Sequence, residues 1–95
     1  MSQYKPVWLQ YYDEQDPEAR PLGRLRAFPM IGTYIALECT SRQYKEILAR
    51  IRITGSTGAP AFIGPKEWAG KMVLARRTVN GFFQSEFAGY VQRVY

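Results

Sequence analysis

The chain has 95 residues, a length that suits a single domain spanning residues 1–95 with a modest core. Hydrophobic residues make up 46% and charged residues 22%, which is the composition of a folded protein with a formal net charge of +5. Histidine is absent and cysteine occurs once, which excludes histidine-based catalysis, multi-cysteine metal sites and internal disulfides, so we expect no catalytic residue, metal site or cofactor.

The first 40 residues predict strands joined by an acidic loop. Aromatic and β-branched residues in YKPVWLQYY (4–12) and RLRAF (24–28) favour two strands, the second ended by Pro29. GTYIALECT (32–40) alternates Ile35, Leu37 and Cys39 with more polar neighbours, which predicts a half-buried strand with Cys39 as a small buried apolar residue. The run between the first two strands is expected to be a solvated loop that holds four carboxylates, Asp13, Glu14, Asp16 and Glu18.

Residues 41–54 fit two periodicities. The spacing of Tyr44, Ile47, Leu48 and Ile51 suits a helix, whereas Ile47, Ala49, Ile51 and Ile53 alternate as in a strand. We favour a helical turn over 41–46, opened by Ser41, and then a strand over 47–54 with Arg50, Arg52 and Thr54 outward.

The last 40 residues predict short strands separated by turns. GSTGAP is a turn in which Gly55 and Gly58 suit positive φ, AFI is a brief strand, and PKEWAG is a helical turn with Trp68 toward the core. KMVLARRTV predicts a strand that a tight turn at Asn80-Gly81 joins to FFQSEF, and YVQRVY predicts a final strand. The fold class is therefore β-rich, all-β or α+β: about six short strands and one or two helical turns, barrel-like or swapped-hairpin.

Positive charge is concentrated in the second half. Residues 1–40 hold four basic and five acidic residues, whereas residues 41–95 hold nine basic and three acidic ones. This asymmetry indicates an anionic partner if the basic side chains share a face, as Arg50 and Arg52 would on one strand. The predicted nucleic-acid contacts are Arg50, Arg52, Lys66, Lys71, Arg76 and Arg77.

The segment ARIRITGSTGAPAFIGPKEWAGKMVLARRT, about residues 49–78, resembles the hairpin of the SpoVT/AbrB-like swapped-hairpin DNA-binding family, in particular its short archaeal members with P-K-E-W-x-G-K. The matching residues here are Gly55, Gly58, Ala59, Phe62 and Ile63, followed by Pro65, Lys66, Glu67, Trp68, Gly70, Lys71 and Val73. The resemblance implies an intertwined homodimer whose basic strand face contacts DNA. Here Pro60 and Gly64 lengthen the spacing before the proline, and about 45 residues precede the motif.

These observations lead to one main hypothesis and two alternatives. The main hypothesis is a non-enzymatic nucleic-acid-binding protein that binds DNA rather than RNA, a dimeric regulator or accessory factor. One alternative is an RNA-binding or ribosome-associated β-barrel in which Tyr90, Tyr95 or Phe83 stacks on unpaired bases. The other is a small protein-interaction module or inhibitor encoded by a virus or mobile element, with a protein partner. Because no stretch approaches the roughly 20 apolar residues of a membrane span or resembles a signal peptide, we expect a cytoplasmic protein with no membrane contact.

Overall fold

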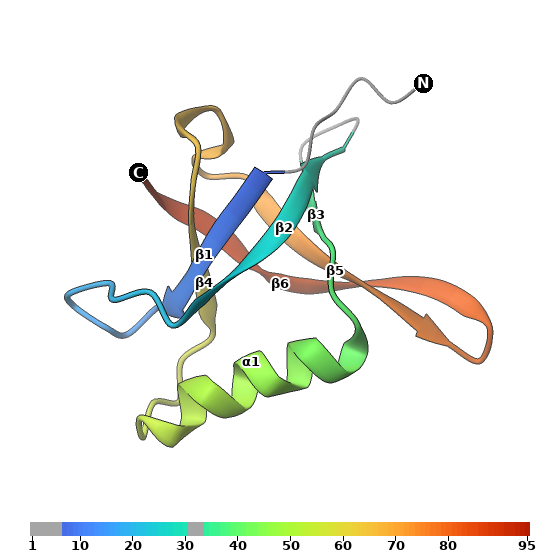
Figure 1. Cartoon of the computed structure of the whole chain (residues 1–95), viewed down its shortest axis with the longest axis horizontal. Helices are drawn as coiled ribbons and strands as arrows, with labels where there is room; N and C mark the ends of the chain where they lie inside the picture. Colours follow the sequence, from blue (N-terminus) through green and yellow to red (C-terminus); the bar gives the residue numbers. More distant parts are fainter. Residues whose placement is uncertain (1–6, 31–33) are drawn as a thin grey trace.

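The computed structural model describes residues 7–30 and 34–95, together with their side chains except at positions 41, 76–79 and 83. Six strands close into a barrel in the order β1-β2-β3-β5-β6-β4, and one helix lies across an end of it (Figure 1). The prediction of a β-rich, barrel-like domain is confirmed. The elements are β1 Val7–Asp13, β2 Gly23–Pro29, β3 Tyr34–Leu37, α1 Ser41–Ile53, β4 Pro60–Gly64, the 3-10 turn η1 Lys66–Trp68, β5 Met72–Val79 and β6 Phe82–Val94.

Alternation along the strands fills the interior of the barrel. In β1, Leu9 and Tyr11 are buried in the main core, whereas Trp8, which precedes Leu9, is exposed. Two parallel pairings, β3 with β5 and β4 with β6, combine with four antiparallel ones to close the barrel. Since closure leaves no strand edge within the barrel, the accessible surfaces there are the outer faces of the strands.

The helix α1 replaces the strand that we expected over residues 47–54, and that prediction was wrong. The helix begins at Ser41, where we expected the helical turn, but its N-cap is Thr40 rather than Ser41. In this capping box the Thr40 side chain accepts a hydrogen bond from the Gln43 N–H, and the Gln43 side chain accepts one from the Thr40 N–H. Tyr44, Ile47 and Ile51 are then buried along one side of the helix. Residues 47–53 follow the helical period rather than the alternating one because the apolar side of this helix packs against the barrel core.

Backbone turns follow the glycine pattern in most places. Gly55 has a φ of 80°, as expected, but Gly58 is not among the glycines with positive φ, and that prediction was wrong. Asn80 and Gly81 have φ values of 52° and 80°, which confirms the tight hairpin turn. The predicted helical turn at 65–70 is present as η1, with Trp68 buried.

The two strands that we expected near the end of the chain are one continuous strand, β6. A bulge opposite Val73 and Leu74 and an unusual backbone at Gly89, with a φ of 148°, let it bend without breaking. An added Cβ at Gly89 would lie 2.4 Å from the Pro60 carbonyl oxygen, so only glycine allows β4 and β6 to approach here.

The strand β3 is buried on both faces rather than half-buried, because Ala36 is buried as well as Ile35 and Leu37. Cys39, which we expected to be buried within the strand, instead follows it and is half-buried, packing against the main core. Burial raises the pKa of the Cys39 thiol above its usual 9.0, as suits an apolar packing residue.

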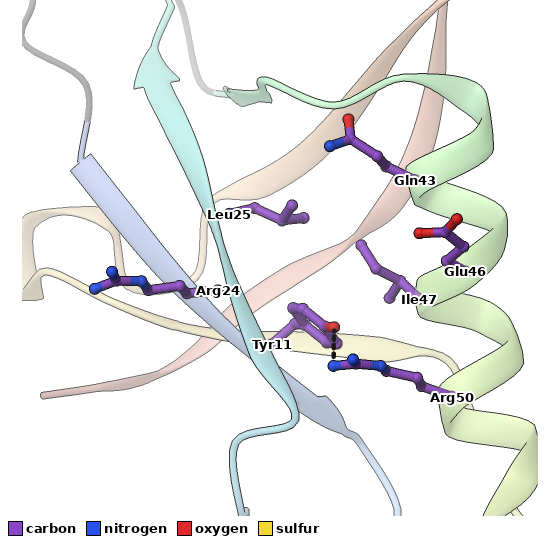
Figure 2. A pocket seen from close by; sticks show the side chains of 7 residues that line it. All are labelled: Tyr11, Arg24, Leu25, Gln43, Glu46, Ile47 and Arg50. Carbon is purple, nitrogen blue, oxygen red and sulfur yellow. Dashed lines mark hydrogen bonds between the residues drawn. The ribbon is translucent and has the colours of Figure 1, made fainter.

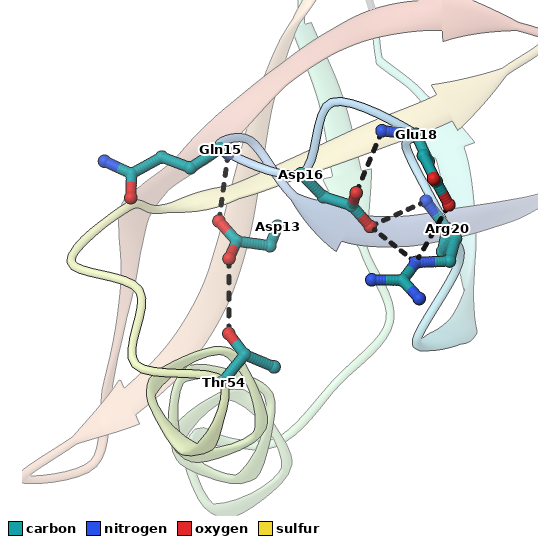
Figure 3. A network of polar contacts seen from close by, with 6 residues as sticks. All are labelled: Asp13, Gln15, Asp16, Glu18, Arg20 and Thr54. Atoms are coloured by element: carbon teal, nitrogen blue, oxygen red, sulfur yellow. Dashed lines mark hydrogen bonds and ion pairs between the residues drawn. The ribbon is translucent and has the colours of Figure 1, made fainter.

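The acidic run is not one solvated loop, because its first carboxylate is buried. Asp13 ends β1 and is 7% exposed; it accepts hydrogen bonds from Gln15 N, Ser56 Oγ and Thr54 Oγ1 at 3.0, 2.9 and 3.4 Å. Figure 3 shows it joining the loop to the end of α1. Asp16 instead organises the loop itself, accepting from the N–H groups of Glu18 and Arg20.

Candidate nucleic-acid interface

The structure distributes the predicted contact residues over several elements. Arg50 and Arg52 lie on α1, where two residues apart means about 200° around the axis, so they do not share a face. Lys66 lies on η1 and Lys71 just after it, at the end of the barrel opposite α1 (Figure 1). Arg76 and Arg77 lie on β5 beyond its pairing with β3, and their side chains lie outside the described part. No single surface holds all six.

The Arg50 side chain forms hydrogen bonds within the protein. Its Nη1 donates to the Leu22 carbonyl oxygen at 2.8 Å and to the Tyr11 hydroxyl at 3.3 Å. Figure 2 shows this contact closing one end of a shallow groove between β2 and α1, whose lining also includes Glu46 and Gln43. Arg50 therefore joins the helix to the loop before β2.

A different basic surface lies on the outside of the barrel. We call it the Trp8 face and define it by side chains that point outward from β1, β2, β4 and β6. In β1 and β2 the outward positions alternate with core residues such as Leu9 and Ala27. The Trp8 face consists of Trp8, Gln10, Arg24, Arg26, Ile63 and Arg93.

An aromatic ring with a stacked cation marks the centre of this face. Trp8 is 45% exposed, and the Arg24 guanidinium carbon lies 4.4 Å from its ring centroid. The Tyr95 hydroxyl donates to the Trp8 carbonyl oxygen at 2.6 Å, which holds a second exposed ring near the same strand. Partial desolvation raises the pKa of the Tyr95 hydroxyl above its usual 10.0.

The strand register places Arg24 and Arg93 at the two ends of one row of paired residues, in which Ile63 is buried. Gln10 pairs with Arg24 on one side and with Ile63 on the other, and Ile63 pairs with Arg93. Because neighbouring strands lie about 4.8 Å apart, the path from the backbone of Arg24 to that of Arg93 is roughly 14 Å when followed around the barrel wall. The Arg93 guanidinium itself lies 5.7 Å from the centroid of the buried Tyr12 ring, which fixes its position.

The carboxylates near the Trp8 face do not cancel its positive charge. Glu38, which follows β3 at the border of the face, pairs with Arg26 at 3.4 Å, whereas Arg24 and Arg93 are in contact with aromatic rings. The carboxylates of Asp16 and Glu18 pair with Arg20, at 3.3 and 3.7 Å. Ala19, from the same loop, packs with Tyr12, Ala61 and Ile63 and so covers the far end of the face while Trp8 stays open.

Sequence reasoning missed the Trp8 face, although a signal for it was present. The run VWLQYY places Trp8 and Gln10 on the side opposite Leu9, and RLRAF places Arg24 and Arg26 on the side opposite Leu25. Counting charge by halves of the chain hid these arginines among the acidic residues of the neighbouring loop. Arg93, far along the chain, joins them only through the barrel topology.

Comparison of the chain with family models, with curated proteins and with solved structures finds no match. Within residues 7–30 and 34–95, no cluster of three or more metal-ligating side chains occurs. In the same part of the chain, α1 and η1 are both too short and too polar to cross a membrane as a helix.

Proposed function

We propose that this chain is a non-enzymatic nucleic-acid-binding protein and that the Trp8 face carries the binding. The observation that supports this most is the exposed Trp8 ring with Arg24 stacked on it, on a face whose cations outnumber its carboxylates. Proteins that bind nucleic acids combine such cations, which neutralise phosphates, with rings that stack on bases. The homodimer and the preference for DNA that the family resemblance implies remain predictions.

The helix α1 is the competing basic surface. It holds Arg42, Lys45, Arg50 and Arg52 but only one acidic residue, Glu46. Arg42 pairs with Glu46 at 3.6 Å and Arg50 bonds to the barrel, so two of its four cations already have protein partners. Its exposed side also lacks an aromatic ring among the described side chains. These features favour the Trp8 face over α1 as the surface that binds nucleic acid.

Two charge-matched double variants test the proposal. Arg24→Gln with Arg93→Gln removes two cations from the Trp8 face, and Lys45→Gln with Arg52→Gln removes two from α1. Fluorescence anisotropy with a labelled oligonucleotide, measured over a salt series, gives the affinity of each. We expect the first pair to lower affinity by about tenfold in low salt and to reduce the salt slope by about 1.4, two single-strand phosphate contacts. The α1 pair is expected to change affinity by less than about threefold.

The opposite ranking of the two double variants would assign binding to α1. If the unmodified protein does not bind oligonucleotides in low salt, the proposed function is wrong. Circular dichroism of each variant shows whether it is folded.

A second candidate function, contact with another protein, rests on an apolar row on the other side of the barrel. Phe87 and Tyr90 on β6 are 50% and 47% exposed, with ring centroids 5.2 Å apart, and they pair across the sheet with Leu74 and Met72. Exposed aromatic rings among apolar neighbours are typical of interfaces. We propose a second copy of the chain as the partner. Sedimentation would then show a dimer that Phe87→Ser with Tyr90→Ser converts to a monomer; a monomeric unmodified protein would contradict it.

A further inference from the structure

The Trp8 face suits a single strand better than a duplex, because its central feature is the flat surface of a ring. In a duplex the faces of the bases are covered by their neighbours, and proteins contact the edges of the bases from the grooves. In a single strand the base faces are open to stacking on aromatic rings and guanidinium planes. An exposed Trp8 beneath a guanidinium offers such stacking partners, which duplex binding would not use.

The Trp8 face is part of the barrel wall and does not project from it. Reading a duplex groove requires a helix or a ribbon that enters it. Trp8 and Gln10 instead stand on β1 in the wall of a closed barrel, with Arg24 beside them on β2 and with β4 on the other side of β1. Unpaired bases can lie on such a wall while the phosphates that join them contact the arginines beside it.

The positions of Arg24 and Arg93 fit a nucleic-acid strand that runs across β2, β1, β4 and β6. Arg24 lies over Trp8, and Arg93 lies on β6, three strands away in the barrel order β2-β1-β4-β6. Gln10 lies between them in the same row, where its amide offers both a donor and an acceptor to a base edge. A chain of nucleotides that follows the barrel wall would meet the Trp8 ring and Arg24 at one end and, beyond the buried Ile63, a second cation at Arg93.

We infer that the ligand of the Trp8 face is single-stranded nucleic acid, with a base stacked on the Trp8–Arg24 pair and phosphates bound by Arg24 and Arg93. This inference rests on the proposed function and specifies its substrate class. The shared chemistry is unpaired bases on a phosphodiester backbone, which either DNA or RNA supplies.

The test compares oligo(dT), oligo(U) and a mixed-sequence duplex of the same length in one salt. We expect at least one of the single strands to bind about tenfold more tightly than the duplex. Trp8→Ala is expected to lower single-strand affinity by about tenfold, the usual cost of one stacked base, and duplex affinity by less than about twofold. Phe82→Ala, which removes another exposed ring at the far hairpin, is the matched control and is expected to leave both unchanged.

Two further measurements separate stacking from charge and from folding. Arg24→Lys keeps the charge but loses the planar group, so we expect it to weaken single-strand binding several-fold while leaving duplex binding unchanged. In the unmodified protein, oligo(dT) or oligo(U) is expected to quench tryptophan fluorescence, because Trp8 is exposed whereas Trp68 is buried. Trp8→Phe should remove this quenching even if Trp8→Ala proves unstable.

Equal affinity for duplex and single strands, or quenching that persists in Trp8→Phe, would overturn the inference while leaving nucleic-acid binding in place. Absence of binding to all three oligonucleotides in low salt would overturn both. Tighter binding of oligo(U) than oligo(dT), or the reverse, supports the inference and identifies the source of the strand.

Discussion

The Trp8 face and the helix α1 are both basic, but they use their arginines differently. On α1, Arg42 pairs with Glu46, and Arg50 donates to the Leu22 carbonyl and the Tyr11 hydroxyl, so the charge serves the fold. On the Trp8 face, Arg26 pairs with Glu38, whereas Arg24 and Arg93 lie against aromatic rings. The contrast teaches that the partners of basic side chains indicate a binding surface better than their number does.

The largest expected effect concerns the scaffold that brings Arg93 into the Trp8 face. Gly89→Ala would place a Cβ 2.4 Å from the Pro60 carbonyl oxygen at a φ of 148°, so we expect a loss of about 3 kcal/mol or more in the free energy of unfolding. Urea denaturation measures this loss.

The matched control for Gly89 is Gly55→Ala at the end of α1. Gly55 also has positive φ, at 80°, but its Cβ would meet no atom within 4 Å, so we expect a cost of only about 1–2 kcal/mol. Equal losses of unfolding free energy in the two variants would show that the close contact between β4 and β6 at Gly89 does not require glycine.

The next effect concerns the attachment of α1 to the barrel. Asp13→Ala removes the acceptor for Gln15 N, Ser56 Oγ and Thr54 Oγ1 in a nearly buried position, and we expect a loss of about 2 kcal/mol in unfolding free energy. Glu18→Ala, on the exposed part of the same loop, should cost less than about 0.5 kcal/mol. Thermal or urea denaturation of both variants measures the two losses. Equal losses would mean that the hydrogen bonds to Asp13 contribute nothing to the stability of the fold.

A smaller effect distinguishes the two arginines of α1 that we expected to contact nucleic acid. Arg50→Met removes the hydrogen bonds to the Leu22 carbonyl and the Tyr11 hydroxyl, so we expect a stability loss of about 1 kcal/mol. Arg52→Met should leave the unfolding free energy nearly unchanged and, like Arg50→Met, alter oligonucleotide affinity by less than about threefold. A tenfold loss of affinity in either variant would shift the contact surface toward α1.

The smallest effect is a local response to acid. Hydrogen bonds from the backbone N–H groups of Glu18 and Arg20 hold the pKa of Asp16 below its usual 3.8. A lowered folded-state pKa means that the loop is favoured above pH 3.8 and loses this contribution as pH falls through the lowered value. The amide signals of Glu18 and Arg20 should therefore titrate below pH 3.8 in NMR spectra; titration above 3.8 would contradict the bonding.

The sequence predicted elements with strong local signals and misplaced one with competing signals. Asn80-Gly81 requires the hairpin and Pro65 with Gly70 brackets η1, since few other conformations suit these residues. Residues 47–54 satisfied both periods, and only contact with the barrel core selects the helical one.

The candidate site was less predictable, because topology assembles it. Trp8 and Arg24 come together through the β1–β2 pairing, but Arg93 reaches them only after β4 inserts between β1 and β6. No local pattern in the sequence specifies that order of strands.

A titration of isotopically labelled protein with oligo(dT), followed through its amide and indole N–H signals, tests the central claim most directly. We predict that the largest shifts occur at the Trp8 indole and at the amides of Gln10, Arg24 and Arg93, while the amides of α1 shift little. Largest shifts on α1, with the Trp8 indole unmoved at saturation, would contradict the assignment of binding to the Trp8 face.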